Sequence, residues 1–336
     1  MSTAEKSALK TDDMAALYRQ CRQCPRNCGA DRLSAQPGFC REDAALRVAF
    51  AGLHFGEEPP ITGKGGSGTI FFTGCTLRCK FCQNFQISQD GLGKEVDSAQ
   101  FTQICRRLQD AGAENINLVT GSHHIPKIAD FLADARNAGI TIPFCWNSSA
   151  YESVTMLERL KGLVTVWLPD FKTLDGALAR SLFDAPDYPE VAAEAIRWMI
   201  ANNPLRIESL DGMQGGEISG KITSGVIIRH LFLPGKFEQT DDVLRWLKQN
   251  ADGRAIVSLM SQYTPIPQKS GKITEFDDRL VTAQEDEDIR DLIDAYDFEW
   301  LFYQELSDDT SWLPDFRRGQ PFSNALAKPL WHCLKD

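Results

Sequence analysis

Residues 69–85, TIFFTGCTLRCKFCQNF, join a short apolar run to the closely spaced cysteines Cys75, Cys79 and Cys82. The run TIFFTG (69–74) is rich in β-branched and aromatic residues, which predicts a buried strand that ends directly at Cys75. Cys thiolates are the usual ligands of iron–sulfur clusters. A C-x3-C-x2-C loop supplies three of them and leaves the fourth iron of a [4Fe-4S] cubane open, as a catalytic zinc keeps an open position.

The alternatives for this loop are plain buried cysteines or a zinc site that takes its fourth ligand from elsewhere in the chain. Zinc loops more often come as paired C-x2-C halves, however, and residues 73–85 lack that pairing. The spacing therefore favours an iron–sulfur cluster with one open iron, where a substrate or cofactor can bind and accept an electron.

The chain of 336 residues suits one large α/β domain with additions at its ends, and its 43% hydrophobic content can form a sizeable core. Its net charge of −10 argues against general nucleic-acid binding, which needs a basic surface to neutralise phosphates. No apolar run approaches the ~20 residues of a membrane span, and the N-terminus lacks the apolar core of a secretory signal. We therefore expect a cytoplasmic protein, in which clustered cysteines bind metal rather than form disulfides.

Strands and helices alternate along the chain after the cysteine loop. Residues 46–68, which are rich in Gly and Pro, and residues 203–224 are expected to be loops. The alternation implies βαβ units around a parallel sheet, which fits a full or partial (β/α) barrel of TIM type. An open, doubly wound sheet is the alternative, but no G-x-G-x-x-G fingerprint follows the first strand. After TIFFTG, apolar runs predict strands at 116–120, 140–146, 163–172, 226–233, 255–260 and 298–303.

The predicted organisation of the chain has three parts. Residues 1–45 form a Cys-rich N-terminal extension that binds metal, residues 46–304 form the partial barrel, and residues 305–336 form a C-terminal strap. The strap is rich in Pro and in large aromatic residues. It either buries these residues against the barrel or closes the substrate side as a lid.

The N-terminal extension holds a second cysteine group, Cys21, Cys24, Cys28 and Cys40, in a C-x2-C-x3-C-x11-C pattern. Four thiolates complete a coordination shell, so an open catalytic site is not expected there. Tetrahedral zinc and a second, fully ligated [4Fe-4S] cluster both fit this pattern. A reduced, metal-free cap is the remaining alternative.

The C-x3-C-x2-C loop after the first strand of a (β/α) pattern resembles the radical S-adenosylmethionine (SAM) superfamily. That resemblance implies a [4Fe-4S] cluster whose open iron binds SAM, and cleavage of SAM to a 5′-deoxyadenosyl radical that abstracts hydrogen from a substrate. The stretches FGEEPPITG (55–63), VWLPDFK (166–172) and IIRHLFLPG (227–235) are similar to the pyruvate formate-lyase activating enzyme-like branch. This similarity covers most of residues 20–265.

The resemblance also implies a set of SAM-binding residues, while no catalytic side chain is expected beyond the cluster ligands. Phe81 precedes the third cysteine, where the superfamily often carries an aromatic residue near the adenine. Residues 117–124, NLVTGSHH, stand in place of the glycine-rich acidic motif that usually binds the SAM amino group. Asn147 is neutral where activating enzymes often have Asp beside a monovalent cation. The expected SAM-binding residues are Phe81, Thr120, Ser122, His123, Asn147, Ser148, Asp170, Lys172 and Arg229.

Some of these residues have structural alternatives. Asp170, Lys172 and Arg229 can instead form ion pairs that close the barrel, although charged residues at strand carboxyl ends usually line the site of such barrels. His123 and His124 are expected to end a strand, so only one of the two side chains can face the site.

The expected activity is that of a radical SAM oxidoreductase similar to the enzymes that activate glycyl radical enzymes. Its substrate, by resemblance, is a glycine in a protein or peptide, and its partner is a low-potential electron donor of flavodoxin or ferredoxin type. Radical modification of a small molecule, or of another protein or RNA target, is the alternative reaction. A metal-stabilised interaction protein without turnover is the alternative from another class.

Overall fold

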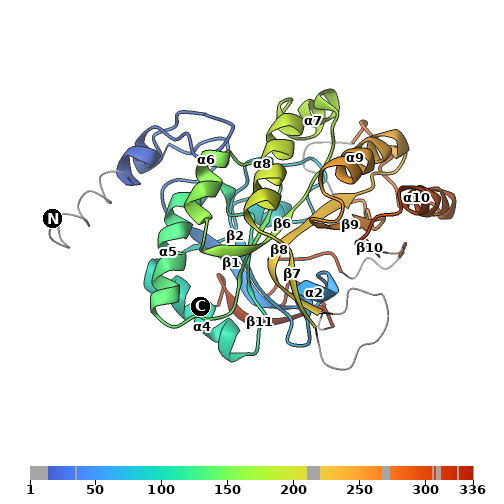
Figure 1. Ribbon diagram of the computed structural model, residues 1–336. Coiled ribbons are helices and arrows are strands. Elements are labelled where there is room, and N and C mark those ends of the chain that lie inside the picture. Colours follow the sequence, from blue (N-terminus) through green and yellow to red (C-terminus); the bar gives the residue numbers. More distant parts are fainter. Residues whose placement is uncertain are drawn as a thin grey trace.

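The computed structural model describes residues 14–34, 36–209, 220–266, 273–304, 306–307, 312–323 and 325–335. Its centre is one curved sheet with the strand order β10-β9-β8-β6-β5-β4-β2-β1-β11 (Figure 1). Two short strands lie off this path, β3 beside β1 and β7 beside β8. The strands are β1 (Arg47–His54), β2 (Ser67–Phe72), β3 (Lys94–Glu95), β4 (Ile116–Val119), β5 (Phe144–Ser148), β6 (Val164–Pro169), β7 (Arg206–Ser209), β8 (Gly220–Leu231), β9 (Ile256–Met260), β10 (Leu301–Gln304) and β11 (Ala327–His332).

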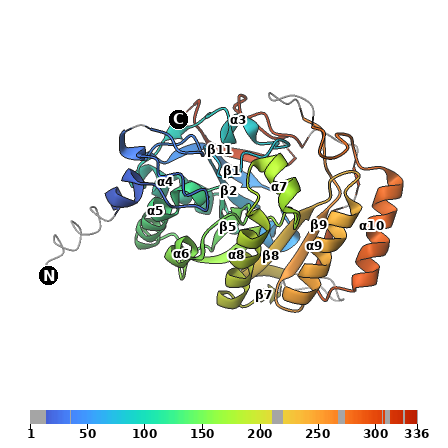
Figure 2. The ribbon, with the colours of Figure 1, turned by 90° about the horizontal axis from the view of Figure 1, so that it is seen from above.

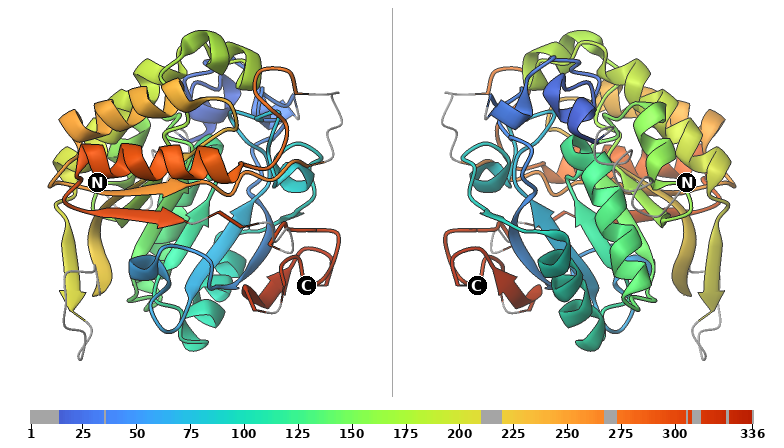
Figure 3. Two further views of the ribbon diagram at one scale, coloured as in Figure 1. Left: turned by 90° about the vertical axis from the view of Figure 1, so that its right-hand side faces the viewer. Right: turned by 90° about the vertical axis from the view of Figure 1, so that its left-hand side faces the viewer.

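Helices line the outer side of this sheet, as the view from above shows (Figure 2). Figure 3 shows α9 and α10 side by side, with β11 at the opposite edge of the molecule. The α-helices are α2 (Pro59–Thr62), α3 (Phe85–Ser88), α4 (Ser98–Asp110), α5 (Ile125–Asn137), α6 (Val154–Leu157), α7 (Gly176–Phe183), α8 (Tyr188–Asn202), α9 (Phe237–Asn250) and α10 (Ala283–Tyr296). Three 3-10 helices are η1 (Arg32–Ser34), η2 (Ser122–His124) and η3 (Glu158–Leu160).

The central part of the sheet is parallel. Every neighbouring pair along the path from β2 through β4, β5, β6, β8 and β9 to β10 runs in the same direction. Within the described residues the sheet is not closed, because β10 and β11 stand at opposite ends of the strand order. The predicted α/β class with a mostly parallel sheet, of the kind found in a partial (β/α) barrel, is therefore confirmed.

The prediction of a loop at residues 46–68 is wrong for its first part. Residues Arg47–His54 form β1, whose inner positions are all buried, and β1 pairs antiparallel with both β2 and β11. The apolar sequence RVAFAGLH stands directly before a Gly- and Pro-rich segment, so the composition of residues 46–68 as a whole does not reveal the strand. Pro59–Thr62 add the short helix α2.

The expected connection at residues 203–224 also contains regular structure. β7 and β8 form an antiparallel ladder there, and residues 210–219 of the connection lie outside the described residues. The helix α7 was not predicted from the sequence. It begins at Asp175, whose side chain accepts hydrogen bonds from the amides of Ala177 and Leu178.

The C-terminal strap contributes to the sheet and to a separate aromatic cluster. Its strand β11 pairs with β1, and Phe316 packs against Phe50 and Phe71 from the first two strands. Gln86 in α3 fixes the strap, because it accepts a 2.6 Å hydrogen bond from the amide of Phe316. Residues 305, 308–311, 324 and 336 of the predicted strap, and 1–13 and 35 of the predicted N-terminal extension, lie outside the described residues.

Two of the longer helices begin with capping boxes. Asp97 and Gln100 form one at α4, and Thr282 and Glu285 form one at α10. In the described part of the chain, none of the helices combines the length and the apolar character that crossing a bilayer requires.

Candidate functional site

The loop with Cys75, Cys79 and Cys82 follows β2 and leads into α3. Cys75 and Cys79 are each 8% exposed, and Cys82 is half-buried. All three are free thiols. Burial raises the pKa of Cys79 and raises that of Cys82 to about 11, and the neighbouring thiols add to both shifts. Both thiols therefore stay protonated at neutral pH unless a positive centre offsets these effects.

Gly74 fixes the start of this loop. Its φ of +82° lies in the left-handed region, which favours glycine. A Cβ at Gly74 would overlap Cγ of Glu42 and would lie 3.0 Å from the carbonyl oxygen of Cys40. The N-terminal extension therefore packs directly against the backbone that precedes Cys75.

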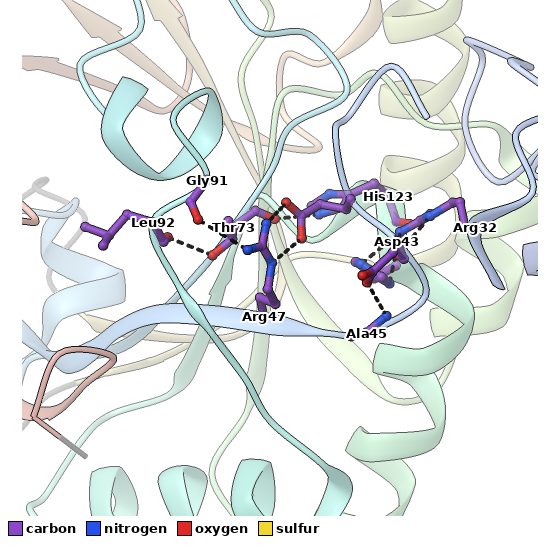
Figure 4. A network of polar contacts seen from close by, with 10 residues as sticks. Arg32, Asp43, Ala45, Arg47, Thr73, Gly91, Leu92 and His123 are labelled. Carbon is purple, nitrogen blue, oxygen red and sulfur yellow. Dashed lines mark hydrogen bonds and ion pairs between the residues drawn. The ribbon is translucent and has the colours of Figure 1, made fainter. Parts of the chain in front are cut away.

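His123 supports the same stretch of backbone from the other side (Figure 4). Its Nε2 lies 2.7 Å from the carbonyl oxygen of Thr73, which it can reach only as a hydrogen-bond donor. His123 is 1% exposed and His124 is fully buried, and both lie in η2. The expectation that they end a strand is wrong, because the chain leaves β4 at Val119 and enters η2 at Ser122.

The other predicted SAM-binding residues lie near the carboxyl ends of neighbouring parallel strands. Since β4, β5, β6 and β8 are parallel neighbours, these residues meet at one edge of the sheet. The same edge carries the cysteine loop, because β2 is parallel to β4. The residues are Thr120 and Ser122 after β4, Asn147 and Ser148 in β5, Asp170 and Lys172 after β6, and Arg229 in β8.

Thr120 has a strained backbone at this edge. Its φ is +62°, and a β-branched residue in the left-handed region costs on the order of 1–3 kcal/mol. The amide of Thr120 donates a 2.9 Å hydrogen bond to the carbonyl of Asn147, which holds the strained turn against β5. Such strain is common where a chain must present a side chain or backbone group to a ligand.

Arg229 is the centre of a group of charged residues. Its Nη1 donates to Oε2 of Glu57 at 2.8 Å, and its Nη2 donates to Oδ1 of Asn147 at 2.6 Å. Its Nε lies 3.3 Å from Oδ1 of Asp170. Burial alone would lower the pKa of Arg229, but the carboxylates of Glu58, Glu57 and Asp170 raise it. Arg229 therefore stays charged and ties β8 to β5, to β6 and to the loop before β2.

Lys172 lies between this charged group and the cysteine loop. Its Nζ is 2.9 Å from Oδ2 of Asp170. Burial lowers the pKa of Lys172, whereas Asp170 and then Cys79 raise it by more. In return, Lys172 partly offsets the effect of burial on the pKa of Cys79. A fixed positive charge thus stands beside one of the predicted cluster ligands.

Sequence reasoning missed the acidic residues Glu57, Glu58 and Glu152. Glu152 is 1% exposed, and its Oε1 accepts hydrogen bonds from Oγ of Ser122 at 2.5 Å and from Nε1 of Trp146 at 3.3 Å. Its Oε2 is buried and has no hydrogen-bond partner in the described part of the chain. Burial raises the pKa of Glu152. The positions of these acidic residues in the sequence could have identified them. Glu152 directly follows WNSSAY (146–151), which contains the predicted SAM-binding residues Asn147 and Ser148, and Glu57 and Glu58 lie in FGEEPPITG (55–63).

Phe81 lies between the second and third cysteines of the loop and is half-buried. Its ring meets that of Phe276 edge-on, with 5.8 Å between the ring centroids. The neighbouring Lys80 forms an ion pair with Glu275 at 2.5 Å. These contacts attach the loop to the segment between β9 and α10.

His230, next to Arg229, holds the backbone that presents Asp170 and Lys172. Its Nδ1 lies 2.7 Å from the carbonyl oxygen of Phe171, and its Nε2 lies 2.9 Å from Oγ1 of Thr240. Burial lowers the pKa of His230 from its usual 6.5 to about 4. The native protein therefore keeps His230 neutral at a pH where the unfolded chain would protonate it.

This pKa shift predicts a measurable pH dependence of stability. A group with a depressed native pKa stabilises the fold above its unfolded pKa, and that stability is lost as the pH falls below 6.5. Between pH 7 and pH 5, wild type should lose about 2 kcal/mol more of its free energy of unfolding than His230→Gln. Urea titrations of both proteins at the two pH values measure the difference. The buried carboxyls are common to both proteins and cancel in this comparison. If the free energy of unfolding changes equally with pH in both proteins, the depressed pKa of His230 is contradicted.

The residues of the cysteine loop fit a [4Fe-4S] cluster. Three thiols on one loop are the donor type that such clusters use. A buried thiol ionises readily only beside a positive centre, and iron supplies one. Lys172 is placed to balance part of the charge of the resulting thiolates. Among the described residues, no three or more His, Cys, Asp or Glu side chains are gathered as the ligands of a single metal ion.

Residues 61–189 match the family model described as the 4Fe-4S single cluster domain. The matched region begins in α2, spans β2, the cysteine loop and β4 to β6, and ends in α8. It therefore includes Cys75, Cys79 and Cys82, whereas the N-terminal cysteine group lies outside it.

The uncharacterized protein MJ0674 of Methanocaldococcus jannaschii is 28% identical to the chain over 305 residues, which are 88% of this chain and 80% of that protein. SuiB of Streptococcus suis, solved bound to the precursor peptide SuiA, is 14% identical over 70% of this chain, with a TM-score of 0.48. The chain spans only 47% of the SuiB chain. A domain of pyruvate-formate lyase-activating enzyme from Bacteroides vulgatus is 11% identical over 54% of this chain and 91% of that domain, with a TM-score of 0.37. At these TM-scores, neither structure bears on the chemistry of this chain.

The family match and the cysteine spacing agree. The C-x3-C-x2-C motif lies inside the matched region, directly after β2 and at the edge of the sheet where the charged strand ends meet. Residues 61–189 are therefore similar to a 4Fe-4S single cluster domain.

Proposed function

We propose that this protein is a radical SAM enzyme that holds its [4Fe-4S] cluster on Cys75, Cys79 and Cys82. Three thiolates from one loop leave one iron without a protein ligand. When bound, the cluster and SAM supply the reductive cleavage of SAM to a 5′-deoxyadenosyl radical, which removes a hydrogen atom from the substrate. The observation that carries the proposal is the meeting of the cysteine loop with the charged ends of β6 and β8 at one edge of the sheet.

The side chains at this edge suit the polar groups of SAM. Lys172 and Arg229 are fixed cations that can bind its carboxylate. The buried carboxyl of Glu152 has an unpartnered oxygen that can accept a hydrogen bond from its ammonium group.

The remaining predicted SAM-binding residues line or support the same edge. Phe81 can pack against the adenine, and the strained turn at Thr120 can present backbone groups. We assign His123 a positioning role, since its contact is with the backbone of Thr73. The others of this set are Ser122, Asn147, Ser148 and Asp170.

For the substrate, we propose a glycine in a protein or peptide. The support is the similarity of FGEEPPITG, VWLPDFK and IIRHLFLPG to the pyruvate formate-lyase activating enzyme-like branch. The structure adds that Glu57 in the first stretch, Asp170 in the second and Arg229 in the third form one charged group. The three similar stretches are thus joined at the site rather than scattered over the fold.

Deuterium transfer tests this substrate class. A cell extract labelled with deuterated glycine is first separated into a protein fraction and a low-mass fraction. The reconstituted protein is then incubated anaerobically with dithionite, SAM and each fraction in turn. We expect deuterium in 5′-deoxyadenosine only with the protein fraction, and none with an extract labelled with deuterated leucine. If deuterium appears in 5′-deoxyadenosine only with the low-mass fraction, the substrate is instead a small molecule.

The same proposal includes the electron donor, the location and the domain boundaries. A flavodoxin- or ferredoxin-type donor would supply the low-potential electron. A cytoplasmic location keeps the ten free cysteines reduced. Residues 1–45 are proposed as a metal-binding extension, 46–304 as the radical SAM core and 305–336 as a strap.

A further inference from the structure

The first three N-terminal cysteines, Cys21, Cys24 and Cys28, lie on one closed loop of the chain. The amide of Cys21 donates to the carbonyl of Ala30, and the amide of Gly29 donates to the carbonyl of Cys21, each at 3.0 Å. Cys24 and Cys28 lie within the segment that these two hydrogen bonds close. Three of the four cysteines are thereby held near one another by backbone contacts alone.

Cys40 joins this loop through Gly38. A Cβ on Gly38 would lie 3.0 Å from Sγ of Cys28 and 3.7 Å from Sγ of Cys40, so both sulfurs face the same glycine. Cys24 lies between Cys21 and Cys28 on the loop that the two backbone hydrogen bonds close. The four cysteines therefore lie in one part of the N-terminal segment, and binding a metal would require their side chains to converge further.

Arg32 is a buried cation beside this group. It is 1% exposed, and its guanidinium donates to the carbonyls of Asp43 and His123 (Figure 4). The guanidinium also donates to Nε2 of His124. Its Nη1 also lies 3.7 Å from Sγ of Cys21. None of these acceptors is a carboxylate, although a buried charge normally has a partner of opposite sign. A centre of negative charge at the cysteines would supply the partner that the buried guanidinium lacks.

We propose that Cys21, Cys24, Cys28 and Cys40 ligate a second metal centre, either a zinc ion or a fully ligated [4Fe-4S] cluster. Four thiolates around either centre carry a net negative charge, which the guanidinium of Arg32 balances. Cys28 is exposed, so the centre lies near the surface, where metal can enter. This inference is independent of the SAM chemistry and of the substrate.

The second centre would lie directly beside the radical SAM loop. Arg26, between Cys24 and Cys28, donates from Nε to the carbonyl of Thr76 at 2.8 Å. The carbonyl of Cys40 lies against Gly74 on the other side of Cys75. Metal bound by the N-terminal group would therefore also brace the loop that carries the first cluster ligand.

Metal analysis of the full chain, purified anaerobically and reconstituted with iron and sulfide, tests the proposal without any substitution. We expect the iron and acid-labile sulfide of two cubanes, or those of one cubane together with equimolar zinc. The iron of a single cubane with no zinc would overturn the proposal.

A triple variant, Cys75→Ala, Cys79→Ala and Cys82→Ala, separates the two centres and identifies the metal. It should retain iron with sulfide if the N-terminal centre is a cluster, and zinc if it is a zinc site. A folded triple variant without metal would overturn the proposal. Because this variant lacks the SAM cluster, its metal content stays informative even if the proposed function fails.

Cys28→Ser is the matched single change, since Cys28 is exposed and contributes nothing to the core. We expect it to lose the metal of the N-terminal group and to retain the cluster at Cys75, Cys79 and Cys82. Cys105→Ser, in the buried face of α4, is the control and should keep the full metal content. Full metal content in Cys28→Ser would count against the proposal.

Discussion

Cys79→Ala is expected to lower the formation of 5′-deoxyadenosine from SAM to the level of a protein-free mixture. Cys79 is buried beside Lys172 and supplies one of three thiols on the loop after β2. With two thiolates the loop cannot hold the cubane in the position that leaves one iron open for SAM. Chromatography of the nucleosides after anaerobic incubation with dithionite and SAM measures the loss, and iron analysis shows its cause.

Cys105→Ala is the control for this substitution. Cys105 is also fully buried, but it lies in α4 among Phe101, Ile104 and Leu108, on the face of that helix packed into the core. We expect some loss of stability and unchanged formation of 5′-deoxyadenosine per cluster. Wild-type turnover by Cys79→Ala, or an equal loss in both variants, would contradict the assignment of Cys79 as a cluster ligand.

Arg229→Met is expected to lower the free energy of unfolding by about 3 kcal/mol or more. The side chain of Arg229 is 15% exposed, and that of Glu57 is 9% exposed. Methionine keeps much of the volume but leaves the carboxylates of Glu57 and Asp170 without their shared cation. An unpaired carboxylate in a buried position costs more than the ion pair contributes. Urea denaturation at pH 7 measures the change.

Arg245→Met provides the comparison at the surface. Arg245 pairs with Asp241 and Asp242 on the exposed side of α9, where water screens the charges. We expect its urea midpoint to match that of wild type. Adding Glu57→Gln to Arg229→Met should recover part of the lost stability, because it removes one uncompensated charge. An unchanged urea midpoint in Arg229→Met would contradict the account, because it would mean that water already screens the charges of Arg229, Glu57 and Asp170.

The sequence was most informative where local pattern and chemistry coincide. The run TIFFTG forms most of β2, and the cysteines follow it directly, as predicted. The predicted strand at 116–120 is β4 without its last residue, and the predicted strand at 255–260 is β9 without its first residue. These features are determined by hydrophobic periodicity and by the spacing of one residue type, both of which can be read within a short window.

Long-range pairing could not be read in this way. The antiparallel pairing of β1 with β11 joins segments from opposite ends of the chain. The burial of Glu152, which follows β5, depends on Ser122 after the neighbouring strand β4 as well as on Trp146 in β5. The local sequence also does not show that η2 places the ring of His123 against the backbone of Thr73. In each case a tertiary contact decides the role of a side chain, and the local sequence does not specify that contact.

Electron paramagnetic resonance of the reduced, cluster-loaded protein, with and without SAM, tests the central claim most directly. If Cys75, Cys79 and Cys82 leave one iron open, SAM will bind to that iron and change the spectrum of the reduced cluster. The change should be absent from the triple variant that lacks these cysteines, even where that variant retains iron on the N-terminal group. A fully loaded wild-type cluster whose spectrum does not change at saturating SAM would contradict the claim that this loop is a radical SAM site.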